Sequence, residues 1–131
     1  MLTESPGGGT EPIGTRIIEV PEVLERTELR DPDSGFIAYV PTGSVKRGEA
    51  LAAGSDRRIS SCAVCHGADL KGLGPVPALA GRSPSYIVRQ LYDIQHGTRN
   101  GAWAALMKPV VAPMTLEDMV ALAAYAASLA P

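Results

Sequence analysis

The sequence contains few aromatic residues, cysteines and histidines. Its 131 residues include one Trp, one Phe, four Tyr, two Cys and two His. Two cysteines can form at most one disulfide. A chain of this length buries one core, and so few rings favour a core that is completed by a large flat cofactor.

The sequence also lacks a long apolar run. No stretch is long enough to span a membrane, and residues 1–14 have neither the basic start nor the apolar segment of a secretory signal peptide. We therefore expect either a mature chain, an engineered version of one, or a fragment of a longer protein.

Charge is unevenly distributed along the chain. The net charge is −2, but residues 1–44 hold eight acidic and three basic side chains, whereas residues 45–131 hold nine basic and six acidic ones. The first part is therefore at −5 and the second at +3. The second part can present a mildly basic face to an acidic partner, and its charge density is far below that of a nucleic-acid-binding domain.

Residues 1–43 have little of the patterning of a folded domain. Residues 1–15 contain several Gly and Pro and predict a flexible leader. The remainder predicts an extended segment at 16–20, a short helix at 22–29, a turn at 31–35 and a β-prone segment at 36–40. We expect a largely irregular acidic arm that wraps around the rest of the chain or docks on another protein.

Helical patterning begins at residue 44 and continues to the C-terminus. The predicted helices run from Ser44, as N-cap, to about 53, from 84 to about 97 behind a Ser83 cap, over 102–107, and from Thr115 onward. The last is the clearest, because Thr115 and Asp118 have the spacing of a capping box. Residues 44–131 thus predict one all-α domain, with a Gly- and Pro-rich loop at 67–81.

Both cysteines lie in the segment Cys62-Ala63-Val64-Cys65-His66. This is the C-x-x-C-H pattern of covalent haem attachment. Residues three and four apart share one face of a helical turn, so both thiols and the imidazole can reach the same porphyrin. Other interpretations are weaker: a zinc site lacks further ligands, a redox dithiol lacks its βαβ context, and a structural disulfide leaves the adjoining His66 unexplained.

The order of segments in residues 44–131 resembles the class I bacterial cytochromes c, especially a single domain of the periplasmic di-haem type. The segments that carry the resemblance are Arg47–Leu51, Cys62–Gly67, Pro77–Gly81, Tyr86–Leu91, Met107–Val111 and Thr115–Tyr125. The resemblance implies a class I cytochrome c fold, with three to five helices around one covalently bound haem c. Two features depart from the minimal domain: the arm at 1–43 and a long loop at 54–61.

The resemblance also implies the residues that hold the iron. His66 and Met107 are its two expected axial ligands, and the carbonyl of Pro77 is expected to accept the Nδ1 proton of His66. Gly48 is expected to lie where the first helix crosses the last, near Tyr125.

Three other residues compete with Met107 for the sixth position. Met114 precedes the last helix and Met119 lies on its apolar face, and we interpret both as core residues. His96 would give bis-His ligation. Its alternative role is contact with the carbonyls at the end of its helix.

The remaining haem-binding candidates are Leu79, Tyr86, Arg99 and Trp103. Tyr86 and Trp103 either line the haem pocket or belong to the ordinary core. Arg99 is the candidate partner for a haem propionate, whereas Arg89 is assigned to a solvated face. Lys71 and Lys108 are expected to flank the haem edge from opposite sides and to steer an acidic redox partner.

These residues predict an electron carrier and not an enzyme, since electron transfer needs no general acid, base or nucleophile. Two alternatives stay open: a permanently bound electron-transfer subunit of a larger redox complex, and a haem domain with an open or bis-His sixth site. The expected partners are donor and acceptor proteins, with the arm as a candidate docking element and with no nucleic acid or membrane span. The expected location is the periplasm.

Overall fold

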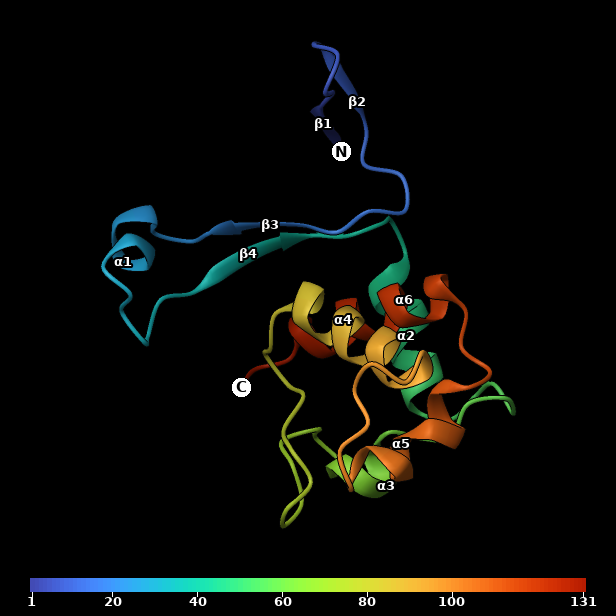
Figure 1. The fold of residues 1–131 in the computed structure, drawn as a ribbon. Helices are drawn as coiled ribbons and strands as arrows, with labels where there is room; N and C mark the ends of the chain where they lie inside the picture. The colour runs from blue at the N-terminus through green and yellow to red at the C-terminus, as the bar shows by residue number, and fades with distance from the viewer.

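The computed structural model describes residues 1–131 and consists of a helical body and an arm that projects from it (Figure 1). The body contains five helices, which are α2 (Ser44–Ala52), α3 (Ala63–His66), α4 (Pro84–Gln95), α5 (Ala104–Val111) and α6 (Leu116–Ser128). None of these helices by itself combines the length and the hydropathy of a membrane span; α5 and α6 meet both criteria only jointly, across a bend of 119°.

Helix α6 forms where the sequence has its strongest N-terminal signal. The Thr115 hydroxyl accepts a hydrogen bond from the amide of Asp118, and the Asp118 carboxylate accepts one from the amide of Thr115. The predicted capping box is therefore confirmed. Most of the residues after it are buried, including Met119, Leu122 and Ala123, so α6 is the central helix of the body.

Helix α2 crosses α6 at a glycine. A Cβ atom on Gly48 would lie 2.6 Å from the carbonyl carbon of Ala121 and 2.8 Å from the Cβ of Tyr125. Real Cβ atoms do not approach other atoms so closely, so only glycine fits at this crossing. The close approach of Gly48 to Tyr125 that the family resemblance implies is therefore present.

The N-terminus of α2 differs from the prediction. Gly43, with a φ of +81°, takes the cap position, and Ser44 is the first helical residue. The Ser44 hydroxyl donates to the carbonyl oxygen of Pro41 at 2.6 Å instead of capping the helix. The assignment of Ser44 as N-cap is wrong because the turn after Pro41 uses that hydroxyl.

Helix α4 begins as the sequence predicts, because the Ser83 hydroxyl accepts from the amide of Tyr86 and Pro84 takes the first position. Helix α5 differs from its prediction. It continues through Pro109 to Val111, whereas the sequence predicts an end before Pro109. Proline removes the bond to the carbonyl of Ala105, and the helix accommodates this loss since Ala105 is exposed to water.

The arm is built from two antiparallel ribbons. Strand β1 (Leu2–Glu4) pairs with β2 (Thr10–Pro12), and β3 (Ile18–Pro21) pairs with β4 (Phe36–Tyr39). The short helix α1 (Leu24–Glu28) connects β3 to β4. The expected leader over 1–15 contains a hairpin that turns at Gly8 and Gly9. Its flexibility stays a prediction.

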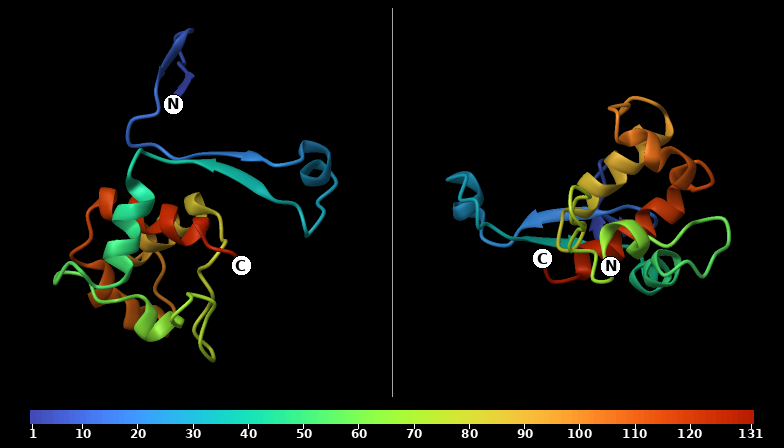
Figure 2. Two further views of the ribbon diagram at one scale, coloured as in Figure 1. Left: turned by 180° about the vertical axis from the view of Figure 1, so that it is seen from behind. Right: turned by 90° about the horizontal axis from the view of Figure 1, so that it is seen from below.

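The β3–β4 ribbon carries α1 away from the body in all three views (Figures 1 and 2). Every residue from 20 to 30 is exposed, so this part of the arm does not wrap around the body as one alternative expected. Only its base is attached: Ile17 packs against the cluster of Ile87, Ala123 and Ala126, and the Ser83 hydroxyl donates to Glu19. The division of the chain at residues 43 and 44 stays a prediction.

Candidate haem site

The two cysteines and His66 lie on one helical turn at the end of the body opposite the arm (Figure 1). Helix α3 starts after Cys62, whose carbonyl oxygen accepts from the amides of Cys65 and His66 at 3.3 and 2.9 Å. Gly67 ends the helix with a φ of +89°. The amide of Cys62 donates to the carbonyl of Ala52 at 3.0 Å, which fixes the motif to the end of α2.

Both cysteines are free thiols, so they are available for thioether bonds. Cys62 is half-buried and packs against the main hydrophobic cluster, whereas Cys65 is exposed. Burial raises the pKa of the Cys62 thiol, and the neighbouring Cys65 raises it further. The protein contains no disulfide and no group of three His, Cys, Asp or Glu side chains that could hold a bare metal ion. The structure therefore does not support the disulfide and zinc interpretations.

His66 is buried and is oriented by a single strong contact. Its Nδ1 atom lies 2.7 Å from the carbonyl oxygen of Pro77, in agreement with the contact that the family resemblance implies. A carbonyl can only accept, so Nδ1 carries a proton, and in the neutral imidazole Nε2 then keeps its lone pair. The chemistry of this donor set fits haem c: two thiols on one turn, beside an imidazole whose free nitrogen can bind iron.

The loop that carries Pro77 is tied back to the motif. The amide of Gly72 donates to the carbonyl of His66 at 2.9 Å, and the amides of Leu79 and Ala80 both donate to the carbonyl of Leu70. These bonds bring Pro77 next to the imidazole of His66, although the two residues are eleven positions apart in sequence.

The candidates for the sixth iron ligand differ in burial. Met107 lies on α5, is half-buried and packs against the same hydrophobic cluster as Cys62. Met114 and Met119 are fully buried members of that cluster, as expected of core residues. His96 is exposed, stacks on Tyr92 with ring centroids 4.0 Å apart, and its Nδ1 lies 3.0 Å from the Tyr92 carbonyl. The alternative role given to His96, contact with a carbonyl at the end of its helix, is therefore the one observed.

The other haem-binding candidates lie on different elements. Leu79 packs beside Ile87 and the small side chains of α6. Tyr86 is about half exposed and Trp103 is 69% exposed, so the interpretation of these two as ordinary core residues is wrong. The Arg99 guanidinium donates to the side-chain oxygen of Gln90 at 2.6 Å. A haem-binding role for these four residues stays a prediction.

Two sets of polar contacts connect the elements around the site, and the sequence did not predict them. The Gln95 side chain donates to the carbonyls of Val111 and Met114, which fastens the end of α5 to α4. Asp118 is fully buried, and its carboxylate pairs with Arg47 at 2.5 Å and with Arg58 at 3.5 Å. Arg58 belongs to the long loop that precedes Cys62, so this pair of arginines connects that loop and α2 to α6.

Comparison with known proteins identifies the fold. The sequence profile of the family described as Cytochrome c matches residues 45–130. The chain belongs to the cytochrome c family. The match covers the whole helical body, including the C-x-x-C-H motif and Met107, so this cytochrome c domain binds haem c covalently and serves electron transport.

The similar proteins differ in length. Cytochrome c-554(548) of Halomonas halodenitrificans is 41% identical over 78 residues, which are 59% of this chain and 93% of that protein. Cytochrome c4 of Stutzerimonas stutzeri is 28% identical over 138 residues, covering 92% of this chain and 64% of that protein. The thiosulfate dehydrogenase electron acceptor of Thiomonas intermedia is 37% identical over 99 residues, and the chain spans less than half of its length.

Solved structures support the same family. The cytochrome c4 of Acidithiobacillus ferrooxidans superposes with a TM-score of 0.62 at 35% identity, over 69% of this chain and 52% of that one. The reduced cytochrome c4 of Pseudomonas stutzeri also gives a TM-score of 0.62, over 82% of this chain and 67% of that one. The predicted class I cytochrome c fold is therefore confirmed, and the relatives are named as cytochromes or electron acceptors.

Proposed function

We propose that this cytochrome c carries one electron on a single haem c, with His66 and Met107 as the axial ligands. The observation that carries the proposal is the orientation of His66: it is buried next to the two free thiols, with Nδ1 occupied by Pro77 and Nε2 free. When bound, haem c supplies the one-electron redox couple. The chain supplies its attachment, its ligands and its exclusion from water.

Cys62 and Cys65 hold the cofactor through thioether bonds in this proposal. Their positions on one turn bring both sulfurs to the same side of the site, and the bond from Cys62 to Ala52 keeps that turn in place. Covalent attachment retains the haem even when an axial ligand exchanges. His66 is held by Pro77 in the tautomer that a metal-binding imidazole requires.

Met107 is favoured over the other methionines by its position. Met114 and Met119 are fully enclosed by the main cluster, whereas Met107 is half-buried at its edge. A side chain at the edge of the core can present its sulfur to a cofactor and still be shielded from solvent. His96 is less suitable because it is exposed and faces the carbonyl of Tyr92.

The ligand assignment is tested by the Met107→Ala variant of the haem-loaded protein. We expect the wild type to show a low-spin ferric spectrum with the weak far-red band of sulfur-to-iron charge transfer. The variant is expected to lose that band, to bind carbon monoxide in the ferrous state, and to have a lower reduction potential, because a thioether favours ferrous iron.

The matched control is Met114→Leu, which changes another methionine of similar volume. We expect the far-red band to persist in this variant. If the band instead survives in Met107→Ala and disappears when Met114 or Met119 is replaced, the assignment of Met107 is wrong. A wild-type spectrum that is high-spin would indicate an open sixth site.

Donor and acceptor proteins are the proposed partners, and two of the relatives are named electron acceptors of thiosulfate dehydrogenase. Lys71 and Lys108 are both exposed and would steer a partner with an acidic face. Such steering predicts an association rate that falls as ionic strength rises. The proposed location is the periplasm, because the cytochromes c that the chain resembles receive haem outside the cytoplasm. Haem staining of periplasmic and cytoplasmic fractions tests this.

A further inference from the structure

The tip of the arm, residues 22–33, exposes apolar side chains that nothing else in the chain covers. Leu24 is 62% exposed and Leu29 is 74% exposed. A two-stranded ribbon ending in a short helix has no second layer in which to bury them. Several large apolar side chains exposed within one short segment favour a binding surface.

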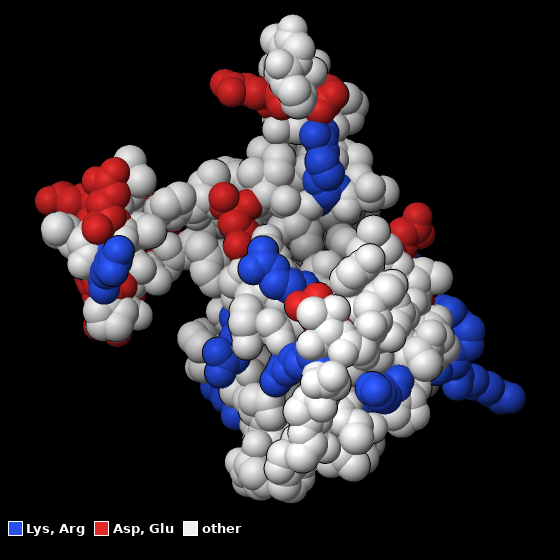
Figure 3. All heavy atoms as spheres, viewed as in Figure 1, with Lys and Arg blue, Asp and Glu red and all other residues white.

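The tip is also acidic. It contains five acidic and two basic side chains, and acidic side chains gather at the end of the arm in Figure 3, whereas Lys and Arg predominate over the body. Leu24 and Glu28 are four residues apart on α1 and therefore share one face. Neither of the two ion pairs in the arm involves Glu28. The tip thus offers a leucine beside a free carboxylate.

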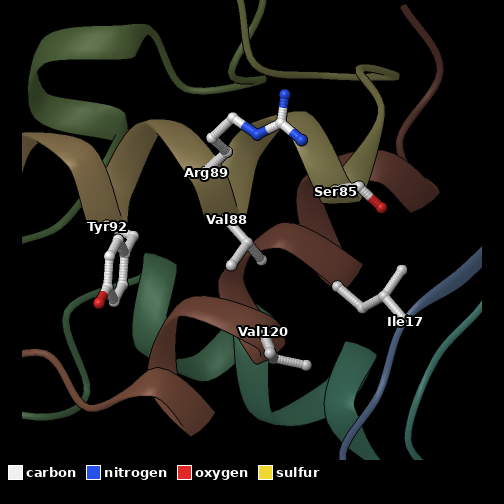
Figure 4. A pocket seen from close by; sticks show the side chains of 6 residues that line it. All are labelled: Ile17, Ser85, Val88, Arg89, Tyr92 and Val120. Carbon is white, nitrogen blue, oxygen red and sulfur yellow. The ribbon is translucent and has the colours of Figure 1, made fainter. Parts of the chain in front are cut away.

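A surface of matching chemistry lies at the base of the arm. An apolar pocket opens between α4, α6 and the start of the arm (Figure 4), and it is lined by Ile17, Ser85, Val88, Arg89, Tyr92 and Val120. Val88 and Val120 face each other there, with Ile17 pointing in from the arm. Arg89 is an exposed lining residue whose side chain extends away from Val88 (Figure 4), and none of the ion pairs of the chain involves it. This pocket would accept a leucine, with Arg89 available to a glutamate four residues further along the same helix.

The arm's own tip cannot fill this pocket, because the β3–β4 ribbon carries α1 away from it (Figure 2). Leu24 follows Ile17 by seven residues, which in extended chain correspond to about 23 Å. A second copy can fill it. When two arms lie antiparallel about a two-fold axis, each tip reaches the base of the other arm, since the distance from base to tip is the same in both copies. The β3–β4 ribbon has two strands, and its outer edges are unpaired. The ribbons of two copies can therefore lie side by side.

We propose that two copies of the chain associate through their arms, each docking Leu24 and Glu28 on the Val88–Arg89 pocket of the other. The opposite charges of arm and body favour this pairing between copies. Docking uses no residue of the haem site, so its failure would leave the electron-carrier proposal intact.

Sedimentation equilibrium of the haem-loaded protein over a range of concentrations tests the proposal. The wild type is expected to reach twice the mass of one chain. Glu28→Arg and Arg89→Glu should each weaken association by about tenfold or more, because each places like charges opposite one another at both contacts. Leu24→Asp should leave the protein monomeric.

An equimolar mixture of the Glu28→Arg and Arg89→Glu variants provides the decisive measurement. A mixed dimer has one original Glu–Arg contact and one reversed contact, both attractive, so mixing should restore the association that is weakened in each variant alone. The matched control is Lys46→Glu, a charge reversal at an exposed position of α2 outside the pocket, which should stay dimeric. The haem absorption spectrum reports that each variant is folded.

Two results would overturn the proposal. One is a wild type that stays monomeric at every concentration up to several hundred micromolar. The other is a dimer that survives Leu24→Asp and both charge reversals, since the two copies would then meet through a different surface.

Discussion

The Nδ1 atom of His66 lies 2.7 Å from the carbonyl oxygen of Pro77. The loop between them makes this contact possible, since Gly67 and Gly72 both adopt positive φ values, of +89° and +96°. L side chains rarely adopt that conformation. A bond from Nδ1 to a backbone carbonyl raises the basicity of the free nitrogen, and so it tunes any metal that this nitrogen binds.

The first prediction concerns Gly72, whose backbone faces the Pro77 segment. A Cβ at this position would lie 3.0 Å from the carbonyl oxygen of Val76 and 3.2 Å from the amide of Ala78. Gly72→Ala should therefore displace this segment and weaken the bond between His66 and Pro77. Because a less basic imidazole stabilises ferric iron less, we expect the reduction potential to rise, as measured by spectroelectrochemistry.

Gly74→Ala is the control for this substitution. Gly74 also has a positive φ, of +57°, but a Cβ there would meet no atom within 4 Å. This variant should show only the backbone strain, about 1–2 kcal/mol of stability, with no change in potential. Equal shifts of potential in the two variants would refute the role given to the Pro77 contact.

The second prediction concerns the crossing of α2 and α6. Gly48→Ala places a methyl group 2.8 Å from the Cβ of Tyr125 and against the backbone of Ala121. Alanine favours helix by up to about 1 kcal/mol, but overpacking typically costs about 1–3 kcal/mol. We expect a net loss of about 1–2 kcal/mol in the free energy of unfolding, measured by denaturant titration.

The neighbouring substitution Glu49→Ala is the comparison for Gly48→Ala. Glu49 is exposed on the same helix, so its replacement should change stability by less than about 0.5 kcal/mol. A Gly48→Ala variant as stable as this control would mean that the two helices can separate without cost.

Short-range patterns accounted for most of what the sequence predicted correctly. The caps of α4 and α6 involve residues three apart, such as Ser83 with Tyr86 and Thr115 with Asp118. Such contacts are encoded within one turn: Ser83 was predicted as a cap, and Thr115 was predicted with Asp118 as its partner. The C-x-x-C-H motif is equally local, so the attachment turn and its side chains were also predictable.

Features that depend on tertiary contacts were not predictable in this way. Arg47 and Asp118 are 71 residues apart, and no local pattern connects them. The Ser44 hydroxyl donates to the carbonyl of Pro41 instead of capping α2, and α5 continues through Pro109. In both cases the surrounding structure overrides the local preference of the residue. The choice of Met107 over Met114 as sixth ligand came from the family resemblance and stays a prediction. The fold adds that the core encloses Met114, whereas Met107 is only partly buried.

The third prediction concerns the buried carboxylate of Asp118. It accepts hydrogen bonds from Arg47 and from the amide of Thr115, and Arg58 lies 3.5 Å away. Asp118→Asn keeps the size of the side chain but removes its charge. Hydrogen bonds to charged groups contribute about 1.5–3 kcal/mol, so we expect a loss of about 2 kcal/mol in the free energy of unfolding. Asp118→Ala also removes the acceptor for the amide of Thr115, which is one half of the capping box, and should lose about 1 kcal/mol more.

Glu117→Gln is the matched control for this carboxylate. Glu117 is next in sequence and lies 3.8 Å from Arg47, but its side chain is 72% exposed. An exposed ion pair contributes little, so this variant should stay within about 0.5 kcal/mol of the wild type. If both neutralised variants had the same stability, burial of Asp118 would not matter to the fold.

The fourth prediction is a pH dependence in the loop before Cys62. The side chain of Arg58 bonds the carboxylate of Asp56, and its amide donates to the same carboxylate; the two contacts hold the pKa of Asp56 below its ordinary value. A depressed folded-state pKa means that the ionised form stabilises the loop. This stabilisation is present above the pKa of an unfolded Asp, about 3.9, and is lost as the pH falls through the lowered pKa.

Replacing Arg58 by Gln removes the larger of the two causes. The pKa of Asp56, followed by the NMR shift of its carboxyl carbon in the reduced protein, should therefore rise toward the ordinary value without fully reaching it, because the backbone bond remains. The neighbouring variant Arg57→Gln removes an equal charge from an exposed residue whose side chain forms no ion pair with Asp56, and it should leave the titration midpoint almost unchanged. Equal shifts in the two variants would show that general charge, and not the contact with Arg58, sets the pKa of Asp56.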